Sequence, residues 1–186
     1  MSWSRILVPT SIVAAVTGGP VGCGDDGLQP DDRIELPGTA AIGATDNRGA
    51  FLAIPPSGEL ELEPGAQGGF HVPIQVRVSA DARDELGEFA FLERTARRLS
   101  DDTLTSRSRF DVRWVEDEAG GFILDFPAFV FLCPTQVGVG VADEPMRLEA
   151  RIGDPDEFVP LVATATVTPR CPTGDQRVFC DQICRG

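Results

Sequence analysis

Four cysteines near the end of the chain are the residues best able to form covalent or metal bonds: Cys133, Cys171, Cys180 and Cys184. An even number of cysteines in an exported chain predicts two disulfide bonds, which can connect in three ways. Cys133 closes one apolar segment and Cys171 follows the last one, so both should emerge at the same edge of a sheet. This favours Cys133–Cys171 with Cys180–Cys184. The alternative joins Cys171 to a cysteine of the tail and Cys133 to the remaining one.

A metal site is the other chemistry open to these residues. Cys171, Cys180, Cys184 and His71 together offer the ligand types that zinc prefers. However, the spacing C-x₈-C-x₃-C lacks the paired C-x₂-C of zinc modules, and export favours oxidation of the thiols. The sequence therefore predicts disulfides here rather than zinc.

Acidic clusters suggest calcium as a further ligand, since hard cations bind grouped carboxylate oxygens. The candidates are Asp154, Asp156 and Glu157, and the acidic residues between 25 and 32. No EF-hand pattern is present, and the order Asp-Pro-Asp is also typical of a turn. We expect no metal site in the chain.

His71 is the only histidine, so any catalytic mechanism with a histidine base must use it. It alternates with apolar residues along a predicted strand, on the polar side with Gln75 and Arg77, and no G-x-S-x-G motif accompanies it. We expect a solvated or hydrogen-bonded strand residue. Paired acids such as Glu116 with Glu118 are expected by chance among 29 acidic residues. The sequence therefore predicts no catalytic residue and no cofactor.

Arginines gather between residues 94 and 113, where six of them face three acidic residues. In an acidic chain this local excess of positive charge indicates a candidate interaction surface. A solvated face that balances acids elsewhere is the alternative. The six residues are Arg94, Arg97, Arg98, Arg107, Arg109 and Arg113.

The composition excludes several classes of protein. The 186 residues contain no lysine, and a P-loop NTPase, a protein kinase or a Schiff-base enzyme needs that amine. The formal net charge of −13 argues against a nucleic-acid partner, because nucleic-acid binders carry a basic surface.

The first 22 residues have the order of a secretory signal peptide. Residues 1–5 carry one positive charge, residues 6–16 are mostly apolar, and small residues follow. The apolar stretch is too short to span a membrane. The signal ends in Pro20-Val21-Gly22-Cys23, which resembles the lipobox of bacterial lipoproteins, although proline stands where leucine is usual.

The lipobox resemblance implies that Cys23 carries a lipid that tethers the chain to a membrane. In this family an aspartate after the cysteine retains lipoproteins in the inner membrane. Gly24 follows Cys23 here, so the resemblance favours the outer membrane. Residues 23–33 then form an acidic, glycine-containing spacer.

From about residue 34 the apolar residues recur with period two, broken by Gly, Pro and Asp turns, as in short β-strands. Residues 84–105 are ambiguous between a helix and a strand from Phe89 to Leu92. The predicted strands lie at residues 59–63, 70–78, 110–114, 122–126, 129–132, 146–152 and 161–167.

Short strands without intervening helices predict a mainly β, antiparallel fold. The layout resembles the immunoglobulin-like β-sandwiches of bacterial envelope proteins, over residues 34–169. Residues 170–186 form a cysteine-rich tail that the disulfides should pin.

These features predict a non-enzymatic, membrane-anchored envelope lipoprotein that binds another envelope protein or a glycan, or that has a structural role. The alternative is a small extracytoplasmic hydrolase or a metal-dependent binding protein.

Overall fold

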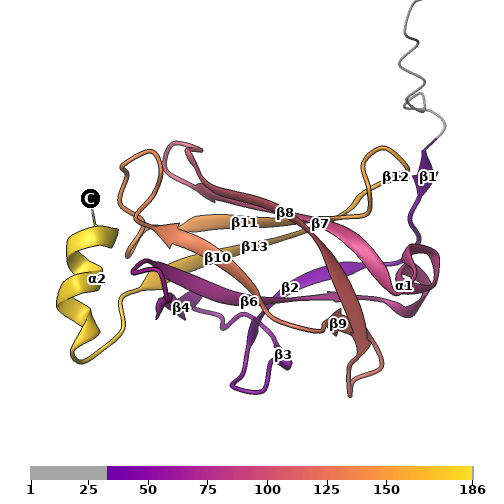
Figure 1. Cartoon of the computed structure of the whole chain (residues 1–186), viewed down its shortest axis with the longest axis horizontal. Helices are drawn as coiled ribbons and strands as arrows, with labels where there is room; N and C mark the ends of the chain where they lie inside the picture. Colours follow the sequence, from indigo (N-terminus) through magenta and orange to yellow (C-terminus); the bar gives the residue numbers. More distant parts are fainter. Residues whose placement is uncertain (1–32, 186) are drawn as a thin grey trace, which may run out of the picture.

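The computed structural model describes residues 33–185, which form one large, mostly antiparallel sheet with two short helices (Figure 1). The expected mainly β fold is confirmed. The elements are β1 (Ile34–Glu35), β2 (Ala40–Thr45), β3 (Phe51–Leu52), β4 (Glu59–Glu61), β5 (Glu63–Pro64), β6 (Phe70–Val78), α1 (Ala80–Leu86), β7 (Phe89–Arg98), β8 (Leu104–Glu116), β9 (Phe122–Leu124), β10 (Ala128–Cys133), β11 (Met146–Ile152), β12 (Phe158–Val159), β13 (Leu161–Arg170) and α2 (Gln176–Cys184).

The strands of the large sheet lie in the order β3-β2-β6-β9-β8-β7-β11-β13-β4. Strands β5 and β10 are not in this series, and each of them also pairs with β6. Strands β13 and β4 are parallel, as are β1 and β12, which form a separate pair. The long strand β8 joins the two halves of the sheet. Its residues 104–113 pair with β7, and its residues 114–116 pair with β9.

The two halves of the sheet share one hydrophobic core. Alternate residues of β6, from Phe70 to Val78, are buried, and so are alternate residues of β11, from Met146 to Ile152. Full burial of such a side chain contributes about 1.5–3 kcal/mol. The period-two pattern of the sequence therefore identified the strands and faces that hold the halves together.

The side of β6 that carries His71 and Gln75 is buried rather than solvated. Gln75 is 0% exposed and His71 only 8%. The Gln75 amide donates to the carbonyl oxygens of Gly49 (2.7 Å) and Leu124 (3.1 Å), and its oxygen accepts from the Leu124 amide (3.0 Å). The β2–β3 loop and β9 thus cover this face, because Gln75 supplies the hydrogen bonds that their backbone needs.

The ambiguous residues 84–105 divide between two elements. Helix α1 ends at Leu86, and β7 then extends from Phe89 to Arg98, so the strand alternative is confirmed and the strand is longer than predicted. Gly87, with φ of +77°, joins the two elements in a conformation that suits glycine.

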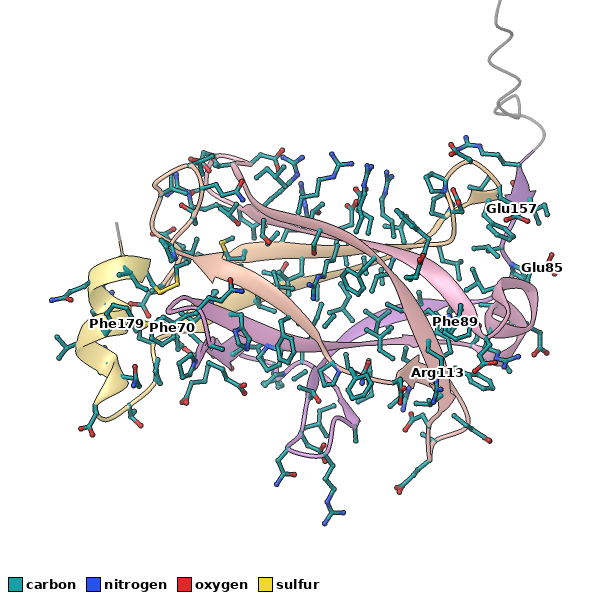
Figure 2. The ribbon with its side chains drawn as sticks, in the orientation of Figure 1. Phe70, Glu85, Phe89, Arg113, Glu157 and Phe179 are labelled. Carbon is teal, nitrogen blue, oxygen red and sulfur yellow. A yellow bond between two sulfur atoms is a disulfide. The ribbon has the colours of Figure 1, made fainter. Side chains whose placement is uncertain are left out.

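The tail is a helix packed on the end of the sheet rather than a loop that only disulfides hold. The ring of Phe179 in α2 lies 5.9 Å from that of Phe70, between centroids, and Figure 2 shows the two side by side. The α2 end lies opposite β1 and α1 (Figure 1). No helix of the described residues is long and apolar enough to cross a membrane.

Candidate binding groove

A groove opens between strands β8 and β10. In the described residues β10 pairs only with β6, and residues 104–113 of β8 pair only with β7. Each strand therefore has an edge without a strand partner, and residues of both strands line the groove. The Asp125 amide donates to the Arg113 carbonyl (2.9 Å) and closes one end, and the groove encloses about 540 Å³.

Aromatic side chains line and surround this groove. Phe126 is 78% exposed, Phe89 62% and Phe129 43%, and the half-buried Phe110 adds a fourth ring. Figure 2 shows Phe89 beside Arg113, away from α2. Three exposed phenylalanines around one hollow are unusual for a surface that contacts only water. The arrangement favours binding of an apolar molecule.

Arg94 of β7 lines the groove and, unlike Arg113, has no carboxylate partner among residues 33–185. Its Nε donates to Ser108 Oγ (2.6 Å), and its guanidinium stacks over the Phe110 ring at 4.5 Å from the centroid. Its Nη1 is buried and has no hydrogen-bond partner among the described residues. Burial lowers the pKa of Arg94 to about 10, so the side chain still carries its charge at neutral pH.

The other arginines of the predicted surface are paired with acids. Arg107 and Arg109 both contact Glu93, the first at 2.9 Å. Burial raises the pKa of Glu93, but hydrogen bonds from these two arginines outweigh it and lower that pKa. Arg113 lies 3.3 Å from Asp125 in the groove, Arg97 lies 3.5 Å from Asp102, and Arg98 binds Asp101. The structure therefore spreads the six residues over the sheet and brings only Arg94 and Arg113 to the groove.

His71 lies behind the groove wall and does not line it. Its ring packs edge-on against that of Phe129, with centroids 4.6 Å apart. Burial lowers the pKa of His71, the charge of Arg94 lowers it further, and Glu63 opposes both. His71 is therefore neutral at pH 7, and Arg94 supplies the positive charge at this end of the groove.

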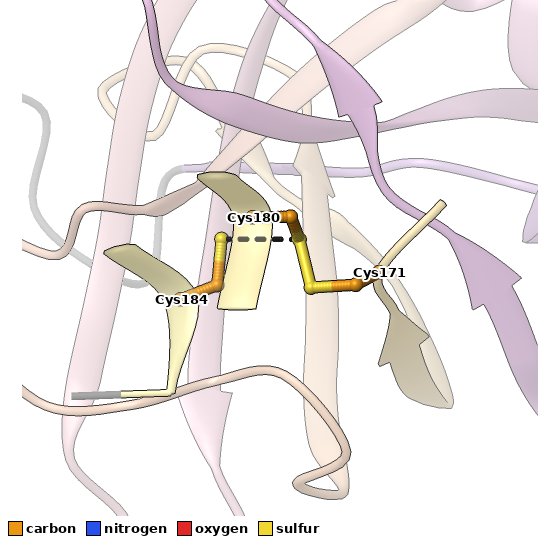
Figure 3. A group of neighbouring side chains, drawn as sticks. All are labelled: Cys171, Cys180 and Cys184. Carbon is orange, nitrogen blue, oxygen red and sulfur yellow. Dashed lines mark hydrogen bonds between the residues drawn. A yellow bond between two sulfur atoms is a disulfide. The ribbon is translucent and has the colours of Figure 1, made fainter. Parts of the chain in front are cut away.

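The predicted pairing of Cys133 with Cys171 and of Cys180 with Cys184 is wrong. The bonds are Cys133–Cys184 and Cys171–Cys180, which was the alternative. Figure 3 shows the Cys171–Cys180 bond beside Cys184. Cys180 and Cys184 lie one turn apart on the same side of α2, with their sulfurs 3.6 Å apart. The helix directs one cysteine to the end of β13 and the other to the end of β10. The pairing favoured from the sequence did not take into account a helix in the tail.

The acidic residues considered for calcium serve a turn. Asp154 Oδ1 accepts from the Asp156 amide (3.0 Å), and the Asp154 carbonyl accepts from the Glu157 and Phe158 amides. Within residues 33–185 the one group of metal-binding side chains that converges is Cys171, Cys180 and Cys184, whose sulfurs the disulfides engage. Cys23 and the acidic residues 25–32 lie outside the described residues.

The aromatic residues of the groove were not identified from the sequence. Phe126 was assigned to a strand and Phe129 to a fully buried one, but β9 ends at Leu124 and Phe129 is half exposed. Pro127 could have indicated that the strand ends before Phe126. A proline cannot donate a backbone hydrogen bond to a neighbouring strand, and it restricts the backbone of the residue before it.

Replacing Arg94 with methionine tests whether the arginine is structural. Because its charge is half-buried and unpaired with an acid, we expect the melting temperature to stay unchanged or to rise, by about 2–4 °C for each kcal/mol gained. The matched control is Arg77→Met. Arg77 also stacks on a ring, that of Phe51, but pairs with Asp117, whose side chain is only 9% exposed, so its loss should lower the melting temperature. A clear drop for Arg94→Met in thermal unfolding would show that Arg94 stabilises the fold.

No protein-family model matches the sequence, and no curated protein matches it either.

Proposed function

We propose that the chain is a non-enzymatic binding module of the bacterial cell envelope, anchored to the outer membrane through a lipid on Cys23, and that the groove between β8 and β10 is its binding surface. The observation that carries the proposal is the charged guanidinium of Arg94, which pairs with no acid among residues 33–185, in a groove surrounded by exposed phenylalanines. An unpaired buried charge costs stability, so a binding role explains its presence better than a structural one.

The groove favours a ligand with a large apolar surface over a glycan. Apart from the Arg113–Asp125 pair, its charged lining is limited to Arg94 and Asp111. A sugar needs many hydrogen-bond partners for its hydroxyl groups, and leaving them unsatisfied is costly. An apolar body needs only the phenylalanine rings and excludes water from them.

The position of the described N-terminus fits a tether. The chain enters the fold at β1, next to β12 and opposite α2 (Figure 1). Residues 24–33, fully extended, would reach at most about 35 Å. The proposed anchor would therefore hold the folded part close to the membrane, with α2 directed away.

We also propose that residues 34–169 form an immunoglobulin-like β-sandwich. Two mostly antiparallel halves of the sheet share one core, and the strand β8 pairs in both halves. This arrangement supports the sandwich fold. In such folds the edges and ends of the sheets are the usual places for binding sites.

Photocrosslinking in the native envelope tests the binding surface. A benzoylphenylalanine in place of exposed Phe126 should give adducts several times more abundant than the same group in place of Val178, which is exposed on α2 at the other end. Intact-mass analysis would identify the adducts as protein or small molecule. Equal labelling at the two positions would contradict a binding role for the groove.

A further inference from the structure

Arg94 has hydrogen-bonding capacity left over. Its Nε bond to Ser108 and its stacking on Phe110 leave the buried Nη1 without a partner among the described residues. Stacking uses the face of the guanidinium and leaves its edge for further hydrogen bonds, and Arg94 is one of the residues that line the groove. A carboxylate accepts two such bonds in parallel, and these charge-assisted bonds are strong in a groove that excludes water.

Resting on the proposed function, we infer that the ligand of the groove is an organic monocarboxylate with an apolar body. Its carboxylate binds the guanidinium of Arg94. Its body lies against Phe110, Phe126 and Phe129.

The rest of the lining limits the ligand to one negative charge. The second arginine of the lining, Arg113, is neutralised by Asp125 at 3.3 Å. A second negative charge on the ligand would therefore find no other uncompensated arginine among the residues that line the groove. This selects against phosphate dianions and dicarboxylates and in favour of a ligand with one charged end.

The dimensions of the groove fit a medium-sized molecule. Its volume of about 540 Å³ lies within the range of sites for small organic ligands. From Ser108, which holds Arg94, to Arg113 at the closed end, β8 advances five residues, or about 16 Å. A ten-carbon chain whose carboxylate binds Arg94 would therefore extend along the phenylalanine rings of the groove.

Calorimetric titration of the purified protein at pH 7 with decanoate tests the inference. We expect decanoate to bind, and Arg94→Gln to weaken this binding at least tenfold. The matched control is Arg107→Gln, which removes the same charge from the outer side of β8 and leaves Arg109 on Glu93, so it should bind like the wild type. Phe126→Ser, at an exposed position that cannot disturb the core, should also weaken binding.

Three other probes decide the chemistry. Decanol should bind the wild type no more tightly than decanoate binds Arg94→Gln, and decyltrimethylammonium should bind more weakly than decanoate. Vesicles of phosphatidylglycerol separate a free carboxylate from an anionic membrane surface. The inference is overturned by absence of decanoate binding, by equal decanoate affinity of Arg94→Gln, or by Arg94-dependent binding to the vesicles alone. Selective crosslinking at position 126 alongside any of these results would leave the proposed function standing.

Discussion

Replacing Cys133 and Cys184 together with alanine is expected to lower the free energy of unfolding by about 4 kcal/mol, on the chain-entropy estimate. The bond spans 51 residues, so its removal frees a long loop in the unfolded chain. It also detaches α2 from β10. Urea unfolding followed by circular dichroism measures the change.

The second disulfide is the matched control. Cys171 and Cys180 lie only nine residues apart, so the same estimate gives about 2.5 kcal/mol for their joint replacement with alanine. Each double variant leaves one native disulfide and no unpaired cysteine within residues 33–185. If the Cys171/Cys180 variant lost more stability than the Cys133/Cys184 variant, or if peptide mapping found Cys133 bonded to Cys171, this account of the tail would be wrong.

The Cys23→Ser variant is expected to move the protein from the membrane fraction to the soluble fraction. The reason is that the proposed lipid supplies about 0.8 kcal/mol for each buried CH₂, and two or three acyl chains together anchor firmly. Fractionation at high salt, with intact-mass measurement of the wild type, gives the result.

Ser11→Ala, inside the predicted signal peptide, serves as the control for an effect on export alone. Its product should remain in the membrane fraction with the lipid mass attached. A Cys23→Ser protein that stays in the membrane fraction, or a wild type without lipid mass, would contradict the anchor.

The strands could be predicted from the sequence because apolar residues recur at every second position along them. β6 and β11 alternate apolar and other residues along their whole length, and this pattern depends only on neighbours in the chain. Burial of the polar side of β6 could not be predicted, since the partners of Gln75 are 26 and 49 residues away in sequence.

The groove could not be predicted either, because it depends on contacts between residues that are far apart in the sequence. The arginine excess was visible in the sequence, but only the structure shows which arginines meet acids. Arg107 and Arg109 reach Glu93 across the β7–β8 pair, whereas Arg94 lies opposite Ser108. The helical tail was missed because α2 has only nine residues, fewer than the window of about 11–18 residues in which a helical period can be recognised.

The most direct test of a ligand at Arg94 is native mass spectrometry of the protein purified from its own envelope. The account predicts that the wild type carries a small organic anion with one charge and an apolar body. Arg94→Gln, equally folded by circular dichroism, should lack this anion, and Arg107→Gln should retain it. A wild type without any such molecule, or the same molecule retained on Arg94→Gln, would contradict the account.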